Sequence, residues 1–496
     1  MLGQDTVPAL VRAAADAYGD HPAYVEGART LSYAELLARV ESTAAAFVEA
    51  GLCDGDRVVV WGPNSIDWAI AGLAASYAGG VLVPANSRYV GAEVADLVER
   101  TEARIVVVDQ GFLGRDQIHE LAAAGVTDPV VVLEELMARE AAPTDFPPRD
   151  PDDVADILFT SGTTGRSKGA MSAHRQSIGV ARAWAELGGV RRDDRYLVVN
   201  PFFHSFGYKI GILVGLLTGA TLYPVATFDV DATMRLIQDE QITVFPGAPT
   251  LYQSMLAAPS RADHDLSSLR LAVTGAAVVP VVLIERMREE LGIDQVVTAF
   301  GMTEAVVVTM CREGDPADLV ANTCGRAIPG METRIDAPDP ESGAGELLVR
   351  GDYVMLGYFN DPEATAEAID PDGWLHTGDI GTLDAEGNLK ITDRLKDMYI
   401  SGGFNVYPAE VEQTLMRCPG VADVAVVGIP DERMGEVGKA YVVASTDPST
   451  QVGPEDVIAF AKQHLANFKV PRQIQIVHTL PRNLSGKVLK TELRDH

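Results

Sequence analysis

The sequence predicts an α/β protein of several domains with largely parallel sheets, and three observations lead to this expectation. Helical patterns such as residues 33–51 alternate with short apolar runs such as residues 56–62 and 103–109, which is the order typical of parallel sheets. After about residue 340 the pattern changes to short, hairpin-like pieces. The chain has 496 residues, 47% of them apolar, and this length exceeds what one hydrophobic core usually supports.

The sequence of the later part of the chain predicts two further structural units. Residues 345–351 and 384–397 predict a β-rich subdomain, with a turn at Glu386-Gly387-Asn388 between two strands. A small, separate α+β domain is expected after it, because helical and strand patterns alternate there. Its expected helices are residues 408–418 and 454–466, and its expected strands are residues 422–430 and 439–445.

The overall charge of the chain argues against two classes of partner. Asp and Glu total 70 against 40 Lys and Arg, for a formal net charge of −30, and such a surface repels nucleic acid and anionic membranes. The apolar stretch at residues 68–85 is rich in Ala and Gly, so we expect a buried helix leading into a strand rather than a membrane span. Four cysteines without C-x-x-C spacing, and no secretion-signal pattern, favour a cytoplasmic location.

A loop rich in Gly, Ser and Thr follows an apolar run at residues 157–159, which predicts a buried strand. The loop offers backbone freedom, hydroxyl donors and one positive charge through Thr160, Ser161, Gly162, Thr163, Thr164, Gly165, Ser167, Lys168 and Gly169. Such a set suits a polyphosphate, although a solvated surface loop has the same composition. The Walker pattern is not met, because Ser167 occupies the position of its second glycine.

Seven motifs in a characteristic order resemble those of the acyl-adenylate-forming superfamily, in particular the acyl-CoA synthetases. They are ILFTSGTTGRSKG (157–169), PFFHSFG (201–207), VTGAAVVP (273–280), AFGMTE (299–304), GWLHTGDIG (373–381), ITDRLKDMYISGGFNVYPAEVE (391–412) and PRNLSGKVLK (481–490). The resemblance implies a two-step reaction, in which a carboxylate attacks the α-phosphate of ATP and the CoA thiol then takes the acyl group. A small-molecule carboxylic acid, ATP, Mg²⁺ and CoA are the implied substrates and cofactors.

The resemblance also implies a domain organisation. Residues 1–395 would form a large adenylating domain of two parallel-type sheet subdomains plus a β-rich subdomain, and residues 396–496 a small mobile α+β domain. Lys396 matches the hinge between them, and Gly402 and Gly403 match positions that line the CoA tunnel. The protein would be a monomer or a homodimer, without a membrane span and without a nucleic-acid partner.

ATP-binding roles follow by matching the motifs. The loop is expected to hold the outer phosphates, the small residues near position 275 to lie against adenine, and Asp379 and Arg394 to contact the ribose. The full set is Thr160, Ser161, Gly162, Thr163, Thr164, Gly165, Lys168, Gly275, Ala276, Ala277, Phe300, Gly301, Asp379, Ile391 and Arg394. Without the resemblance, the small residues would predict only a tight turn, and the Asp–Arg pair only a salt bridge.

Four residues match catalytic positions. Thr303 supplies a hydroxyl for the α-phosphate, and Glu304 supplies a carboxylate suited to Mg²⁺, with Thr163 as a second metal position. Lys487 matches the lysine that relieves repulsion between the attacking carboxylate and the phosphate. His204 matches a residue that gates the carboxylate pocket. Taken singly, three of them have a plainer interpretation: Glu304 as a surface acid, Lys487 as a tail lysine and His204 as a packed core histidine.

The substrate pocket is expected to be mostly apolar. Its expected residues are His204, Phe206, Tyr208, Lys209, Val273, Thr274, Met302 and Val306. Lys209 would either meet a second polar group on the acid or point into solvent. Two departures from the family pattern bear on rate and selectivity: Phe300 replaces a commoner tyrosine, and Arg166-Ser167 replaces a frequent Lys-Pro.

The chain is most similar in appearance to actinobacterial CoA ligases for the ring-bearing propanoate of steroid degradation. The segments FFHSFGYKIG, CGRAIPG and DRLKDMYISGGFNVYPAEVEQ carry this likeness. An aryl acid, a linear fatty acid or an acceptor other than CoA remains an alternative. An amino-acid substrate is disfavoured, because the region of His204 lacks the aspartate that such relatives use for the substrate ammonium. An inactive relative is disfavoured because Lys487, Glu304 and Thr303 are all present.

Overall fold

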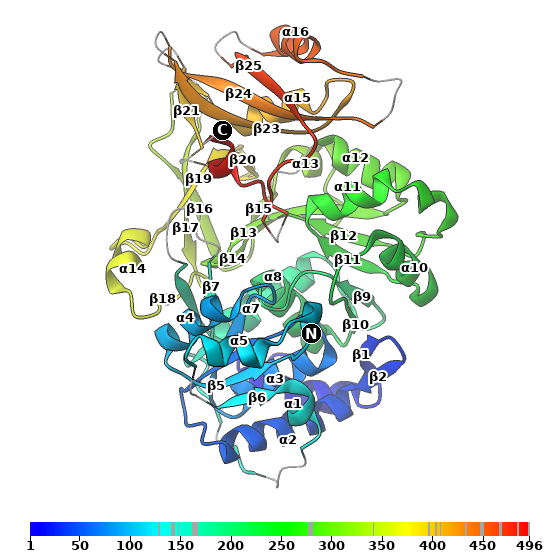
Figure 1. Ribbon diagram of the computed structural model, residues 1–496, viewed down its shortest axis with the longest axis vertical. Coiled ribbons are helices and arrows are strands. Elements are labelled where there is room, and N and C mark those ends of the chain that lie inside the picture. Colours follow the sequence, from blue (N-terminus) through cyan, green and yellow to red (C-terminus); the bar gives the residue numbers. More distant parts are fainter. Residues whose placement is uncertain are drawn as a thin grey trace.

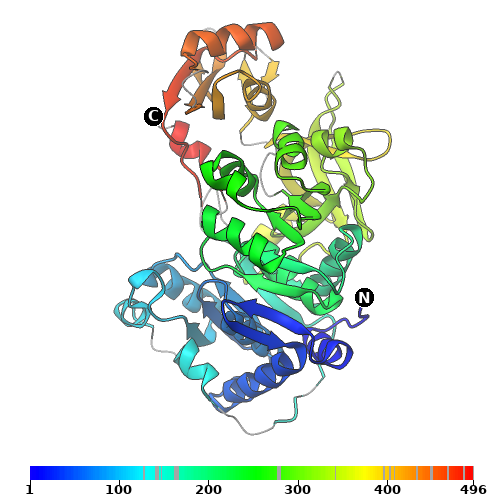
Figure 2. The same ribbon diagram turned by 90° about the vertical axis from the view of Figure 1, so that its right-hand side faces the viewer.

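The computed structural model of the protein describes residues 1–496 except 127, 128, 140–143, 147, 161–166, 276–280, 341, 395, 396, 402, 403, 407, 432, 433, 447–450, 466–468, 484, 485, 495 and 496; for residues 393, 394, 400, 404 and 405 it describes the backbone only. A large part of the molecule, coloured blue to yellow, carries a small C-terminal part, orange and red, at one end (Figure 1). The same two-part arrangement is visible after a 90° turn (Figure 2).

The first large sheet has seven strands in the order β18-β8-β7-β4-β3-β5-β6. Its bounds are β3 (Arg57–Trp61), β4 (Val81–Ala85), β5 (Ala103–Val108), β6 (Val130–Val132), β7 (Val154–Phe159), β8 (Gly169–Ala173) and β18 (Gly357–Tyr358). The strands from β7 to β6 pair in parallel. β7 and β8 instead form an antiparallel pair, so the Gly-rich loop connects the two strands of a hairpin.

The second large sheet has nine strands in the order β15-β14-β13-β12-β11-β9-β10-β1-β2. Its bounds are β1 (Pro22–Glu26), β2 (Arg29–Ser32), β9 (Arg195–Val198), β10 (Thr221–Pro224), β11 (Val244–Gly247), β12 (Leu271–Thr274), β13 (Gln295–Met302), β14 (Ala305–Met310) and β15 (Arg326–Ala327). The central strands pair in parallel and the outer ones antiparallel. These two sheets match the expected parallel-type subdomains.

Two smaller sheets follow in the chain. The β-rich subdomain is an antiparallel sheet of β16 (Met331–Asp336), β17 (Gly345–Gly351), β19 (Leu375–Leu383) and β20 (Leu389–Arg394). The C-terminal sheet contains β21 (Tyr399–Ser401), β22 (Phe404–Val406), β23 (Val421–Asp431), β24 (Gly435–Ala444) and β25 (Gln473–Val477). The predicted fold class, with its β-rich subdomain and small α+β domain, is thereby confirmed.

Helices cover these sheets. They are α1 (Val7–Tyr18), α2 (Tyr33–Glu49), α3 (Ile66–Tyr77), α4 (Gly91–Thr101), α5 (Gln117–Ala123), α6 (Leu133–Met137), α7 (His174–Leu187), α8 (Ser205–Gly207), α9 (Val214–Thr218), α10 (Val230–Glu240), α11 (Pro249–Ala257), α12 (Val281–Glu290), α13 (Ala317–Asn322), α14 (Pro362–Ala368), α15 (Pro408–Leu415), α16 (Pro454–His464) and α17 (Lys490–Arg494). Three short pieces of other helix type are η1 (Phe112–Gly114), η2 (Tyr208–Leu213) and η3 (Pro259–Asp263).

The helix α3 explains how the two large sheets share one core. Eleven of its twelve residues are buried, and it contacts β3 and β4 of one sheet and β1 of the other. A helix that is apolar on all sides must be covered on all sides. The apolar stretch at residues 68–85 is therefore a buried helix followed by a strand, as predicted. Among the helices that the structure describes, none has the length and hydropathy needed to cross a membrane.

Candidate active site

The Gly-rich loop is closed at its base by two hydrogen bonds between its ends. The Thr160 amide donates to the Lys168 carbonyl at 2.9 Å, and the Lys168 amide donates to Thr160 Oγ1 at 3.2 Å. The Lys168 ammonium lies 5.0 Å from the centroid of the Tyr358 ring, which is cation–π distance. The loop therefore leaves the sheet from a fixed base with a positive charge beside it. The expected phosphate contacts of Ser161, Gly162, Thr163, Thr164 and Gly165 lie outside the described residues.

Thr303 and Glu304 form the tight turn between β13 and β14, whose flanking residues Met302 and Ala305 pair with each other. The Glu304 side chain is buried, and the Tyr358 hydroxyl donates to its Oε1 at 2.7 Å. Burial and the neighbouring Glu304 carboxylate raise the pKa of Tyr358 well above its usual value. The phenol therefore stays a donor, and it holds one carboxylate oxygen in place.

Tyr358 was not anticipated from the sequence. It lies in β18, a strand of two residues that pairs with β8, and neither its spacing nor its neighbours mark it as functional. In the folded chain its ring faces Lys168 and its hydroxyl binds Glu304. Tyr358 thus links the motif at residues 157–169 with the motif at residues 299–304.

The donor set at Glu304 fits Mg²⁺. A buried carboxylate with one oxygen fixed by a phenol is a hard oxygen ligand, and Mg²⁺ typically takes one or two carboxylates together with phosphates and water. Within the described residues no cluster of three or more His, Cys, Asp or Glu side chains could hold a metal by itself. One carboxylate is enough on the protein side for Mg²⁺ when phosphates and water supply its other ligands.

His204 caps the short helix α8, with its Nδ1 accepting from the Phe206 amide at 3.2 Å. Burial lowers the pKa of His204 to about 4, so the ring is neutral and its proton is on Nε2. A Cβ on Gly207 would lie 2.1 Å from the Pro201 carbonyl oxygen, so only glycine fits this turn. The helix widens into the π-helix η2 directly after it, a form often found at functional sites.

Lys209, at the start of η2, does not point into solvent, so that alternative is wrong. Its side chain is 1% exposed and its ammonium lies 3.0 Å from Asp156 Oδ1. It also donates to Ser172 Oγ at 2.7 Å, and the Ser177 hydroxyl donates to Asp156 Oδ2 at 2.6 Å. Asp156 and Ser172 belong to β7 and β8. The ion pair therefore ties the helix that follows His204 to the hairpin that carries the phosphate loop.

The other expected pocket residues lie at strand ends of the second large sheet or beside it. Val273 and Thr274 end β12, Met302 ends β13, Val306 lies in β14, and Phe206 packs against the main core. A Cβ on Gly275 would lie 2.6 Å from the Ala299 carbonyl oxygen. Gly275 is therefore required for close approach of two chain segments, whatever else it does.

Asp379 and Arg394 are direct partners across the β19–β20 ladder. Asp379 is buried, and its backbone amide donates a hydrogen bond to Thr377 Oγ1 at 3.1 Å. The side chain of Arg394 lies outside the described part of the structure.

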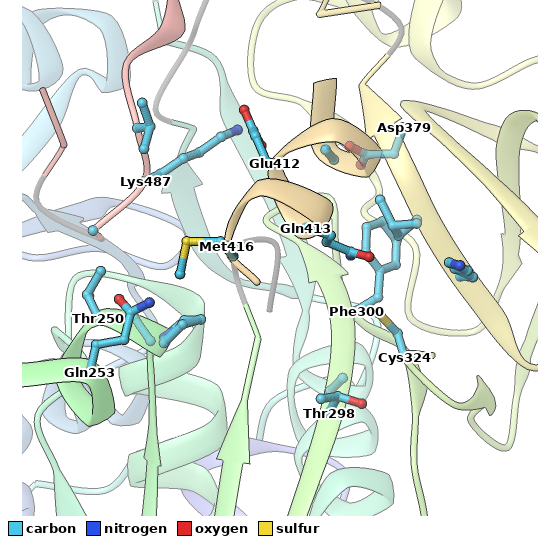
Figure 3. A pocket seen from close by; sticks show the side chains of 18 of the residues that line it. Thr250, Gln253, Thr298, Phe300, Cys324, Asp379, Glu412, Gln413, Met416 and Lys487 are labelled. Carbon is cyan, nitrogen blue, oxygen red and sulfur yellow. The ribbon is translucent and has the colours of Figure 1, made fainter. Parts of the chain in front are cut away.

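A cavity of about 240 Å³ lies between the large and the small part of the molecule. From the large part it is lined by Thr250, Gln253, Phe300, Gly301, Cys324, Asp379 and Ile391, among others, and from the small part by Glu412, Gln413, Met416, Arg482, Lys487 and Lys490. Figure 3 shows side chains of both parts around one space, among them Thr250, Phe300, Asp379, Glu412 and Lys487. Four motifs far apart in the sequence thus meet here.

Some of the expected site residues line this cavity and others do not. It brings together Phe300, Gly301, Asp379, Ile391 and Lys487. Lys168, His204, Thr303 and Glu304 do not line it, although Glu304 follows Phe300 closely in the AFGMTE motif. Ala276, Ala277, Lys396, Gly402 and Gly403 lie outside the described residues. Glu412 was not singled out from the sequence, and its only signal was membership of the motif at residues 391–412.

Comparison with known proteins identifies the family of this chain. The family model described as AMP-binding enzyme matches residues 11–359, and the model of the AMP-binding enzyme C-terminal domain matches residues 410–487. An enzyme named 3-[(3aS,4S,7aS)-7a-methyl-1,5-dioxo-octahydro-1H-inden-4-yl]propanoyl:CoA ligase is 53% identical in Rhodococcus jostii, over 99% of this chain and 98% of that protein. Its namesake in Mycobacterium tuberculosis is 51% identical, over 99% and 98%.

The fold has a close counterpart among solved structures. The ATP-bound crystal structure of MatB from Rhodopseudomonas palustris superposes with a TM-score of 0.89 at 32% identity, covering 99% of this chain and 98% of that one. The chain therefore belongs to the AMP-binding enzyme family, and the family resemblance of its motifs is confirmed.

Proposed function

We propose that the protein is an ATP-dependent acid–thiol ligase that makes acyl-CoA through an acyl-AMP. In the first step a carboxylate oxygen bonds to the α-phosphorus of ATP while the bond to pyrophosphate breaks. In the second step the CoA sulfur bonds to the acyl carbon, AMP leaves, and the thiol proton passes to solvent. The observation that carries the proposal is the cavity that Lys487 shares with Phe300 and Asp379.

The cavity suits an adenosine with its phosphates. The Phe300 ring offers an apolar face for the base, and the buried Asp379 carboxylate accepts hydrogen bonds from the ribose hydroxyls. The loop after Thr160, with Lys168 at its end, would hold the outer phosphates. Mg²⁺, when bound at Glu304, would neutralise phosphate charge. The hydrogen bond from Tyr358 would hold the Glu304 carboxylate in place for this role.

Lys487 would act at the bond-forming step. An attacking carboxylate and an α-phosphate are both anions, so their approach is opposed by charge. An ammonium placed beside both offsets this repulsion in the transition state. Lys487 is on the small domain, so its presence in the cavity depends on how the two domains meet. We therefore propose that residues 396–496 move relative to residues 1–395 between the two steps.

The acid is proposed to be a propanoate that carries a fused two-ring ketone, as in the names of the relatives from Rhodococcus jostii and Mycobacterium tuberculosis. A neutral His204, whose ring accepts a hydrogen bond from the Phe206 amide, supports an uncharged pocket around the acid. ATP and CoA are abundant in the cytoplasm, and all four cysteines are free thiols, which supports a cytoplasmic location.

The test is a pyrophosphate-release assay with a panel of acids, with and without CoA. The panel contains a bicyclic keto-propanoate, an aryl acid and linear acids. We expect the bicyclic acid to give the highest kcat/KM and CoA to be consumed in equal amount to the pyrophosphate formed. Release of no pyrophosphate with any acid would refute the ligase proposal, and turnover without CoA consumption would refute CoA as the acceptor.

A further inference from the structure

Lys487 lies in a small hairpin whose described residues are 481–483 and 486–489, with Arg482 and Val488 paired across it. Within it the Lys487 amide donates to Asn483 Oδ1 at 2.9 Å, and the Leu489 amide donates to the Pro481 carbonyl at 2.9 Å. Gly486 packs on the large domain, since a Cβ on this residue would lie 2.6 Å from Thr250 Oγ1. The described part of the hairpin is thus held by backbone hydrogen bonds and reaches across the domain boundary.

The base of this hairpin is fastened to the small domain by two ion pairs. Arg482 pairs with Asp423 of β23. Lys490 pairs with Glu412 of α15 at 2.9 Å, and these two side chains are only 15% and 14% exposed. A pair at this depth is less screened than a surface pair and has a more fixed geometry. The second pair therefore limits how far the segment after Lys487 can shift.

Glu412 has a further anchor that fixes its own position. Its Oε1 accepts from the Val426 amide of β23 at 2.7 Å, besides binding Lys490. The carboxylate thus joins α15, β23 and the segment after Lys487. It also lines the cavity, where the Lys487 side chain extends toward it (Figure 3). A carboxylate facing a long, flexible lysine restricts the positions that its ammonium occupies.

We propose that Glu412 is a positioning residue for Lys487 in the acyl-AMP-forming step. It acts through Lys490 on the hairpin and through its charge on the Lys487 ammonium, and it does not touch the reacting atoms. The proposal rests on the ligase function proposed above. The contact between Glu412 and the hairpin lies wholly within the small domain, yet we expect it to affect only the first half-reaction. A contact that merely keeps the small domain folded would affect both half-reactions.

The test compares the two half-reactions in Glu412→Gln. Glutamine keeps the shape and the acceptor for the Val426 amide but removes the charge. We expect acyl-AMP formation, measured as pyrophosphate released in a single turnover, to slow by roughly 10- to 100-fold, as for a misplaced catalytic group. The rate of thioester formation from supplied acyl-AMP and CoA should stay within about 3-fold of the wild type. This step needs a folded small domain but does not need Lys487 to be held in position.

Two further variants separate positioning from folding. Glu410→Gln, two residues earlier on α15, removes an analogous pair with Lys469 at 2.6 Å, and Glu410 does not line the cavity. It should leave both half-reactions near wild type. Lys490→Met should reproduce the selective loss, and the double variant Glu412→Gln/Lys490→Met should lose little more.

The outcomes are distinct. Equal loss in both half-reactions of Glu412→Gln, an unimpaired first half-reaction, or the same loss in Glu410→Gln would overturn the positioning role while leaving the ligase proposal intact. A wild-type protein that releases no pyrophosphate with any acid would overturn both proposals. A loss confined to the first half-reaction in both Glu412→Gln and Lys490→Met is the result that supports the positioning role.

Discussion

The Tyr358 hydroxyl donates a 2.7 Å hydrogen bond to Oε1 of Glu304, and the same ring lies under the Lys168 ammonium. One tyrosine therefore contacts both the residue proposed to bind Mg²⁺ and the lysine at the end of the phosphate loop. Because its pKa is raised by burial and by Glu304, it remains protonated across the working pH range. The geometry of the Glu304 carboxylate depends on this donor.

Tyr358→Phe should weaken the response to Mg²⁺. A hydrogen bond to a charged group contributes about 1.5–3 kcal/mol, so we expect the Mg²⁺ concentration for half-maximal pyrophosphate release to rise by roughly 10-fold. Tyr353→Phe, a partly buried tyrosine five residues earlier, is the control. An unchanged Mg²⁺ dependence in Tyr358→Phe would contradict the role of the phenol.

Lys487→Ala should separate the two half-reactions. Loss of a cation aimed at a developing negative charge costs on the order of 100-fold or more in rate, and we expect this loss in acyl-AMP formation. Thioester formation from supplied acyl-AMP should change by only a few-fold. The two rates are measured by pyrophosphate release and by thiol consumption, and an equal fall in both would count against the assignment.

The KM for the acid should not respond to pH through His204. Burial lowers the pKa of His204 to about 4, so the ring stays neutral from about pH 5.5 to 7.5. A histidine with an ordinary pKa would become cationic below pH 6.5 and attract the carboxylate more strongly, lowering the KM. Steady-state kinetics over this range should give a flat KM, and a clear decrease toward low pH would show a protonated His204.

His174 should make the free energy of unfolding depend on pH. Burial, followed by the nearby Arg149, lowers the pKa of His174 to about 4, so the unfolded chain binds more protons below pH 6.5. The folded state should therefore lose up to about 1.4 kcal/mol per pH unit as the pH falls from 6.5 toward 4. His174→Asn retains an acceptor for the Val7 amide and should reduce this slope. Urea unfolding of the wild type and of His174→Asn at pH 7, 6 and 5 measures this dependence. The same change in the free energy of unfolding with pH in both proteins would refute the prediction.

Lys209→Met should destabilise the fold. The variant leaves Asp156, which is fully buried, without its cation, and breaking a buried pair costs about 3–5 kcal/mol. Adding Asp156→Leu should restore much of that loss, because two apolar side chains replace the whole pair. Urea unfolding of the single and double variants checks this, and a double variant no more stable than Lys209→Met would argue against a buried charge as the cause.

Much of the fold follows from local patterns. The apolar run at residues 157–159 ends the buried strand β7, and residues 33–51 and 408–418 contain α2 and α15. Period, caps and turn residues act over a few positions, so they are visible in one stretch of sequence. The antiparallel partner of β7 was not anticipated, because strand pairing depends on where β8 packs.

Only some residues of the candidate site could be predicted from the sequence. Motifs indicated Glu304, Asp379 and Lys487, because their chemistry and their neighbours match a family. They did not indicate Tyr358 or Glu412, whose contacts come from other parts of the chain. Lys209 is buried, although a lysine is usually solvated. Its burial is explained by the ion pair with Asp156, which only the folded structure reveals.

By itself, the sequence determined the order of helices and strands, the residue types available for binding an anion, and the family to which the chain belongs. The tertiary structure alone decided which of these side chains share a space: Lys487 with Asp379 and Phe300, and Tyr358 with Glu304. It also decided that His204 is neutral. The physical reason is that side-chain type and periodicity are local properties, whereas burial, charge pairing and pKa depend on neighbours that folding brings from distant segments.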